Sequence, residues 1–303
     1  MSVESPNFFL YAQHGWADDN REIAALASSL ATSKIRVIAP RLGYIQTWIR
    51  IEPLIRVVEE IAIATTTAYP NTPIKIIAHS MGGLIWLEVL NRHPEWWPLV
   101  HSLVLLASPV GGADLGRILD PFSIGIGIAQ GLGKNRRPIA EKIAAFVPTL
   151  VIAGDIDGGG DGTITVGSTK IRHAQFIRLL GLSHPVLRNH PLVVAAIRGF
   201  WARAGELEEN IKHTDLDLNE VIQRLQSVPG MTDAHQRDFY RAKVFMTLKD
   251  GTTIRTWKNP LGVDHIFIAS PQGQYLYGGF VGWVHAEDLL QALKEIKQNY
   301  SAL

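Results

Sequence analysis

Short runs of apolar residues recur along the first two hundred residues, and stretches with helical spacing separate most of them. The runs are short and uniformly hydrophobic, which is typical of strands buried on both faces. They cover residues 7–12, 34–40, 74–78, 101–108, 149–155 and 174–181, and helical patterns cover 21–31, 47–67, 84–90 and 186–204. This alternation predicts an α/β fold, in which a mostly parallel sheet is covered by helices on both faces and a site lies at the carboxyl ends of the strands.

The pattern changes after about residue 205. Residues 205–210 are charged, and the runs that follow alternate between apolar and polar positions. Lys249-Asp250-Gly251 and Pro271-Gln272-Gly273 join such runs and predict two β-hairpins. Residues 286–299 have the pattern of an amphipathic helix. We therefore expect two domains, 1–205 and 206–303, of which the second is a small α+β domain of unknown role.

The third apolar run leads through Ala78-His79-Ser80-Met81-Gly82-Gly83 into a helical stretch. A serine at so sharp a strand-to-helix corner has a strained backbone, and its hydroxyl is lifted above the edge of the sheet. Strand and helix come so close around the corner that the positions two before and two after the serine must be small. Ala78 and Gly82 meet this requirement, which makes Ser80 a candidate nucleophile.

A serine nucleophile needs a base, and the base needs an acid to orient it. His184 follows the sixth apolar run and comes last in the expected order of serine, acid and histidine, whereas His190 falls in the next helical stretch and is a weaker candidate. The loop after the fifth run offers three carboxylates. Asp161 is favoured because apolar structure restarts directly after it, Asp157 is the alternative, and Asp155 is expected to fix the loop through its backbone.

The oxyanion of an acyl-transfer reaction needs two fixed donors. One is expected to be the backbone N–H of Met81, directly after the serine. The other is expected from His14-Gly15-Trp16, with the N–H of Trp16 as donor and Gly15 allowing a close approach. An apolar substrate pocket is predicted from the side chains of Trp16 and Met81 and from the segment that contains Ile124 and Ile126. Gly15 and His79 are expected to form other parts of its wall. The alternative for the apolar side chains is simple packing in the core. The glycines within 121–128 weaken a rigid helix, which favours the interpretation of residues 113–147 as a mobile flap over the pocket. The alternative is a crossover helix followed by a loop.

Composition narrows the function further. A formal net charge of +1 over 303 residues argues against a general nucleic-acid binder, and the absence of cysteine excludes thiolate catalysis and cysteine-based zinc sites. The first residues lack the pattern of a secretory signal, and no run approaches the ~20 apolar residues of a membrane span, so we expect a cytoplasmic protein. The acid loop is similar to a calcium loop, but Val166 stands where an EF-hand needs a glutamate. We therefore expect neither metal nor cofactor.

As a set, these residues resemble the α/β-hydrolase superfamily, and within it the small serine lipases and esterases of bacteria. The matching positions are His14-Gly15-Trp16, Ala78-His79-Ser80-Met81-Gly82-Gly83, Ala107-Ser108-Pro109, Gly111-Gly112, Asp161-Gly162 and Gly181-Leu182-Ser183-His184. The resemblance covers about residues 7–204 and implies a Ser80 nucleophile, an Asp161 acid and a His184 base that cleave a small-molecule or lipid ester through an acyl-enzyme. A thioesterase, an acyltransferase and a non-catalytic binding module on the same fold are the alternatives.

Overall fold

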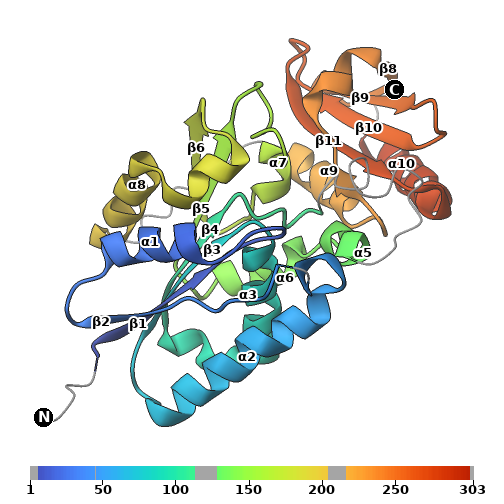
Figure 1. The fold of residues 1–303 in the computed structure, drawn as a ribbon. Coiled ribbons are helices and arrows are strands. Elements are labelled where there is room, and N and C mark those ends of the chain that lie inside the picture. The colour runs from blue at the N-terminus through green and yellow to red at the C-terminus, as the bar shows by residue number, and fades with distance from the viewer. Residues whose placement is uncertain (1–5, 45, 113–127, 204–215, 301–303) are drawn as a thin grey trace, which may run out of the picture.

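A computed structural model describes residues 6–44, 46–112, 128–203 and 216–300. Six strands of the first part form one sheet in the order β2-β1-β3-β4-β5-β6 (Figure 1). Their bounds are β1 (Phe8–Gln13), β2 (Ile35–Ile38), β3 (Ile74–His79), β4 (Val100–Leu106), β5 (Thr149–Asp155) and β6 (Gln175–Leu180). All neighbouring strands are parallel, which confirms the expected sheet and places the loops after β1, β3, β4, β5 and β6 along one edge.

Helices cover both faces of this sheet, as predicted (Figure 1). Phe9 and Tyr11 of β1 belong to one buried cluster and Leu10 and Ala12 to another, because successive side chains of a strand point to opposite faces. The first cluster is closed by α2 (Ile51–Ala68), α3 (Met81–Arg92), α5 (Ile128–Gly133) and α6 (Arg137–Ala144), and the second by α1 (Arg21–Leu30) and α8 (Pro191–Ala202).

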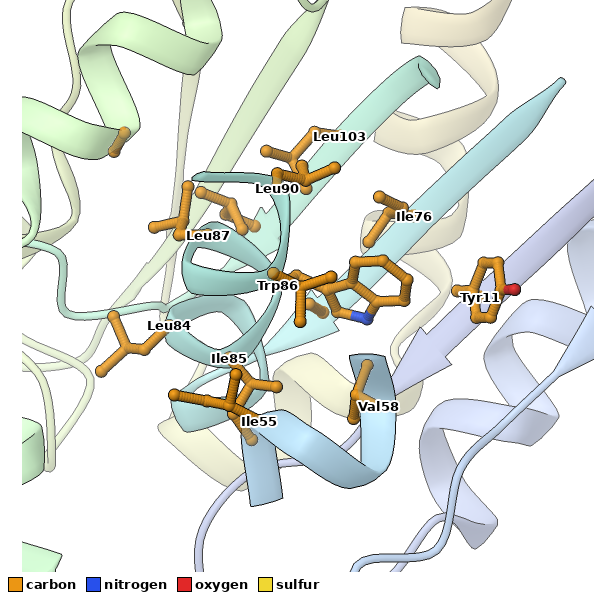
Figure 2. Close-up of a cluster of buried hydrophobic side chains, with 14 of the residues drawn as sticks. Tyr11, Ile55, Val58, Ile76, Leu84, Ile85, Trp86, Leu87, Leu90 and Leu103 are labelled. Carbon is orange, nitrogen blue, oxygen red and sulfur yellow. The ribbon is translucent and has the colours of Figure 1, made fainter. Parts of the chain in front are cut away.

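The helix α3 is held firmly between the sheet and α2. The Trp86 ring is 1% exposed, and its centroid lies 4.8 Å from that of Tyr11 in β1. Figure 2 shows Trp86 beside Ile76 of β3, with Val58 of α2 on its other side. This packing fixes the helix that begins directly after Ser80, and so it fixes the corner on which the serine stands.

The second part of the chain builds its own sheet. Its strands are β7 (Thr232–Asp233), β8 (Lys243–Thr247), β9 (Thr253–Lys258), β10 (Asp264–Ala269) and β11 (Tyr275–Val281), in the antiparallel order β7-β11-β10-β9-β8. The hairpins β8–β9 and β10–β11 are the two that the sequence predicts. The helices α9 (Leu216–Gln226) and α10 (Ala286–Tyr300) share a buried cluster with one face of this sheet.

Two helices begin later in the structure than the sequence predicts. The helix expected from residue 186 begins at Pro191, because the 3₁₀ turn η3 (His184–Asn189) comes first. The helix expected from residue 47 begins at Ile51, after the 3₁₀ turn η1 (Gln46–Trp48). The junction at 205–210 lies outside the described residues, so the exact division into 1–205 and 206–303 stays a prediction. No helix within the described ranges is long and apolar enough to span a bilayer.

Candidate active site

Ser80 stands at the corner between β3 and α3 with φ 55° and ψ −125°. A positive φ is uncommon for a residue with a side chain and costs about 1–3 kcal/mol. The conformation is held because the Ser80 N–H donates to the Leu106 carbonyl of β4 at 2.8 Å, while α3 is packed from the other side. The backbone geometry is therefore that of the expected strained corner.

The loop after β1 lies directly against this corner. A Cβ on Gly82 would lie 2.7 Å from the backbone carbonyl oxygens of both Gln13 and His14. A Cβ on Gly15 would lie 2.9 Å from the Cβ of Ser80. Only glycine fits at these two positions without a shift of backbone or serine, which gives a steric reason for both glycines.

Asp161 and His184 come together from the loops after β5 and β6. The Nδ1 of His184 donates to Oδ2 of Asp161 at 2.7 Å, and the His184 N–H donates to the Asp161 carbonyl at 2.9 Å. The other carboxylate oxygen accepts from the N–H groups of Thr163 and Ile164 at 3.0 and 2.7 Å. The buried carboxylate thus fixes the ring orientation of His184 and leaves Nε2 for proton exchange.

Ser80 and His184 line one cavity of about 270 Å³ at this edge of the sheet. Its other lining residues are Trp16, Ala17, Asp18, His79, Met81, Pro109, Leu132, Thr163, Ile164, Pro185 and Arg188. In the described structure the Ser80 hydroxyl makes no hydrogen bond to His184. Such contacts are often long before substrate binds, so the arrangement is compatible with proton transfer from Oγ to Nε2.

The two expected oxyanion donors flank the same cavity. Met81 is the first residue of α3, where backbone N–H groups have no acceptor within the helix. The Trp16 ring packs on Trp48 with centroids 4.4 Å apart, which anchors the loop after β1. His14, whose role the sequence analysis missed, holds this loop as well: its Nε2 accepts from the Leu42 N–H and its Nδ1 donates to the Gly15 carbonyl. That Trp16 and Met81 bind an oxyanion remains a prediction.

No protein-family model and no curated protein matches this sequence. Among solved structures, the mature lipase BlEst2 of Bacillus licheniformis superposes with a TM-score of 0.50 at 12% identity, covering 66% of this chain and 93% of that one. This chain has the α/β-hydrolase fold. MenH of S. aureus has a TM-score of 0.49 at 16% identity, covering 67% of this chain and 96% of that one. The fold is the one expected from the sequence, and the chemistry of this chain has to be argued from its side chains.

The other carboxylates of the acid loop have partners of their own in this α/β-hydrolase fold. Asp155 accepts from the N–H groups of residues 157–159 and pairs with Arg178, which confirms that it fixes the loop. Burial raises the pKa of Asp155, but these donors outweigh it and hold the pKa below its usual value. Asp157 contacts His235 instead of His184, and His190 caps α8. Of the candidate acids and bases, the fold therefore brings together Asp161 and His184.

His79 lies behind the candidate base of the hydrolase fold. Its Nε2 donates to the His184 carbonyl at 3.1 Å, and the two ring centroids are 4.6 Å apart. Burial lowers the pKa of His79 well below its usual value, so the ring is neutral at neutral pH. His79 lines the cavity, as expected, and also supports the loop of His184.

Gly15 was expected to form part of the pocket wall, but it is not among the residues that line the cavity. The predicted pocket residues Ile124 and Ile126 lie outside the described residues, as does the part of the expected flap at 113–127. Leu132 of α5, within the same 113–147 segment, lines the cavity. Asp18 and Arg188, which were not predicted as site residues, form an ion pair at the cavity, 2.5 Å apart. No sequence signal marks it, because the two residues are 170 positions apart. Within the described ranges, no three acidic or histidine side chains are placed to hold a metal ion.

Proposed function

We propose that this protein is a serine hydrolase that cleaves carboxylic esters through an acyl-enzyme on Ser80. One observation carries the proposal: a serine on a strained strand-to-helix corner shares a cavity with a histidine whose Nδ1 is bound by a buried aspartate. Serine, base and orienting acid come from three loops at the edge of the sheet where α/β folds place their sites. The fold alone would not support this activity, because it hosts many functions.

The geometry suggests the following sequence of steps. Ser80 Oγ attacks the ester carbonyl while His184 Nε2 accepts the hydroxyl proton, and Asp161 stabilises the imidazolium. The N–H groups of Met81 and Trp16 stabilise the oxyanion. The C–O bond to the alcohol then breaks, the alcohol takes the proton from His184, and the acyl group remains on Oγ. A water molecule, deprotonated by His184, attacks the acyl-enzyme and releases the acid.

The test uses a fluorophosphonate, which labels an activated serine covalently, together with p-nitrophenyl esters. We expect the wild-type chain to label and to hydrolyse short-chain esters, and Ser80→Ala to do neither while its circular dichroism is unchanged. Ser183→Ala, next to the candidate base, is the matched control and should label normally. Acyl thioesters and added alcohols in the same assay separate ester hydrolysis from thioesterase and acyltransferase activity. Absence of labelling in the folded wild-type protein would instead indicate a non-catalytic member of the fold.

A further inference from the structure

The segment that follows β7 reaches across to the loop that carries Asp161. His235 Nδ1 accepts from the Arg237 N–H at 3.0 Å, which places the ring proton on Nε2. That Nε2 then donates to Oδ2 of Asp157 at 3.1 Å. The side-chain amide of Gln236 donates to the Gly158 carbonyl. Two neighbouring residues of the second part of the chain thus bind two neighbouring residues of the acid loop.

The contact is also a close steric fit. A Cβ on Gly159 would lie 3.0 Å from Cγ of Gln236, and a Cβ on Gly160 would lie 3.3 Å from Cδ2 of His235. The side chains of the second part therefore occupy the space that the glycines leave open. The outer edge of the loop is built from residues without side chains, and His235 and Gln236 pack directly on it.

A buried ion pair anchors this contact. Arg137 and Asp233 are 2.6 Å apart, and their side chains are 6% and 3% exposed. Arg137 also donates to the carbonyls of Gly167 and Lys170, at and just after α7 (Val166–Thr169), which directly follows the acid loop. Figure 1 shows the second sheet beside α7. Because the Ala234 N–H donates to the Gly278 carbonyl of β11, His235 and Gln236 extend from a segment that is itself bound to a sheet.

We propose that His235 and Gln236 are positioning residues, which hold the 156–164 loop so that Asp161 stays on His184. The inference rests on the proposed function. The loop contains four glycines, of which Gly158 and Gly162 have φ of 84° and 90°, and such a chain loses much conformational entropy when it is fixed. Asp155 binds the inner side of the loop, and His235 and Gln236 bind the outer side, only a few residues from Asp161. A displacement of about 1 Å in a catalytic group lowers a rate by up to about a hundredfold.

The first test is kinetic and uses the full chain. In His235→Leu/Gln236→Leu we expect kcat on p-nitrophenyl acetate to fall about tenfold or more, because Asp161 is displaced from His184. His235→Gln keeps an N–H donor near the position of Nε2, so it should lower kcat much less than the double variant does. Gln272→Leu, on the turn between β10 and β11, is the matched control and should leave kcat unchanged.

The second test does not depend on turnover. The His184 Nδ1 proton shared with Asp161 should give a far-downfield proton NMR signal in the wild-type chain and in Ser80→Ala, and this signal should broaden or vanish in the double variant. Gln236→Glu is a near-isosteric second variant that places an oxygen against the Gly158 carbonyl and should act in the same direction. If the wild type has no esterase activity, the proposed function fails and this signal alone decides the inference. An unchanged signal in folded variants overturns the inference, whether or not kcat falls.

Discussion

The carboxylates after β5 are chemically identical side chains, but each has a different environment. Asp155 is bound by three N–H groups and Arg178, Asp157 by its own loop and His235, and Asp161 by two N–H groups and His184. Of the three, only Asp161 can orient the His184 imidazole, because only Asp161 has a carboxylate oxygen against Nδ1 of His184. At the scale of the residue, function is therefore decided by the partner and not by the type of side chain.

Asp161→Asn should reduce kcat on p-nitrophenyl esters by orders of magnitude. The amide can present its N–H₂ to Nδ1, which favours the wrong tautomer of His184 and removes the charge that stabilises the imidazolium. Asp157→Asn retains an oxygen for the N–H groups of Gly159 and Gly160, so its loss should stay within about tenfold. A larger loss in Asp157→Asn than in Asp161→Asn would show that the acid has been assigned to the wrong residue.

The buried His79 predicts how stability depends on pH. Its folded-state pKa lies below the unfolded value of about 6.5, so between these two values the unfolded chain binds more protons than the folded one. The free energy of unfolding should therefore rise with pH in that window and fall as the solution is acidified below about pH 6.5. His79→Gln keeps a donor to the His184 carbonyl and should make the free energy of unfolding depend less on pH. Urea unfolding at several pH values is the measurement.

At the scale of the element, the candidate active site depends on how closely α3 approaches the end of β1. Packing of Trp86 and its neighbours holds α3 against the sheet, and the glycine at position 82 allows the carbonyls of Gln13 and His14 to touch the helix. This contact places the loop with Trp16 beside Ser80. The helix, the strand end and the candidate oxyanion donors thus form one rigid unit.

Two glycine-to-alanine changes in helices test this contact. Gly82→Ala should destabilise the protein by about 1–3 kcal/mol and lower kcat, because the new methyl group meets backbone carbonyls that cannot move aside. Gly199→Ala in α8 should be neutral or stabilise by up to about 1 kcal/mol, because alanine is the better helix former. Its Cβ would meet nothing closer than 3.7 Å. Urea unfolding of both variants measures the difference, and equal effects would contradict the close approach.

At the scale of the whole molecule, the two parts of the chain are joined by a buried ion pair between α6 and β7. Arg137 and Asp233 both lie nearly inaccessible to solvent, and the Asn135 side chain donates to the Gln226 carbonyl nearby. Ion pairs on the surface contribute little, whereas removal of one partner of a buried pair leaves an uncompensated charge. The contact between the two parts should therefore be sensitive to a single substitution here.

Asp233→Ala should lower the free energy of unfolding by about 3–5 kcal/mol, since it strands the Arg137 charge in the interface. Arg137→Met/Asp233→Leu should regain much of that loss because no charge remains buried. Glu295→Ala is the control, because it breaks an exposed ion pair within the second part of the chain. The side chains of Arg224 and Glu295 are 36% and 39% exposed, so this change should barely alter the melting temperature. Calorimetry on the four proteins is the measurement, and a double variant no more stable than Asp233→Ala would contradict the argument.

The sequence by itself determined the parallel sheet, the helices on its two faces, the two hairpins and the corner at Ser80. These features are local: strands and helices follow from hydrophobic period, and the corner follows from small residues around one serine. The chain order of Ser80, Asp161 and His184 could be predicted for the same reason, since each follows an apolar run.

Only the tertiary structure decided which carboxylate faces His184, because the path of a glycine-rich loop depends on what packs against it. The sequence analysis left Asp157 open as the acid, and the structure turns it toward His235, 78 positions away. The two-residue strand β7 and the pair of Asp18 with Arg188 were missed because neither has a periodic pattern. Contacts between segments so far apart in the chain arise from packing, which local patterns of hydrophobic and polar residues do not encode.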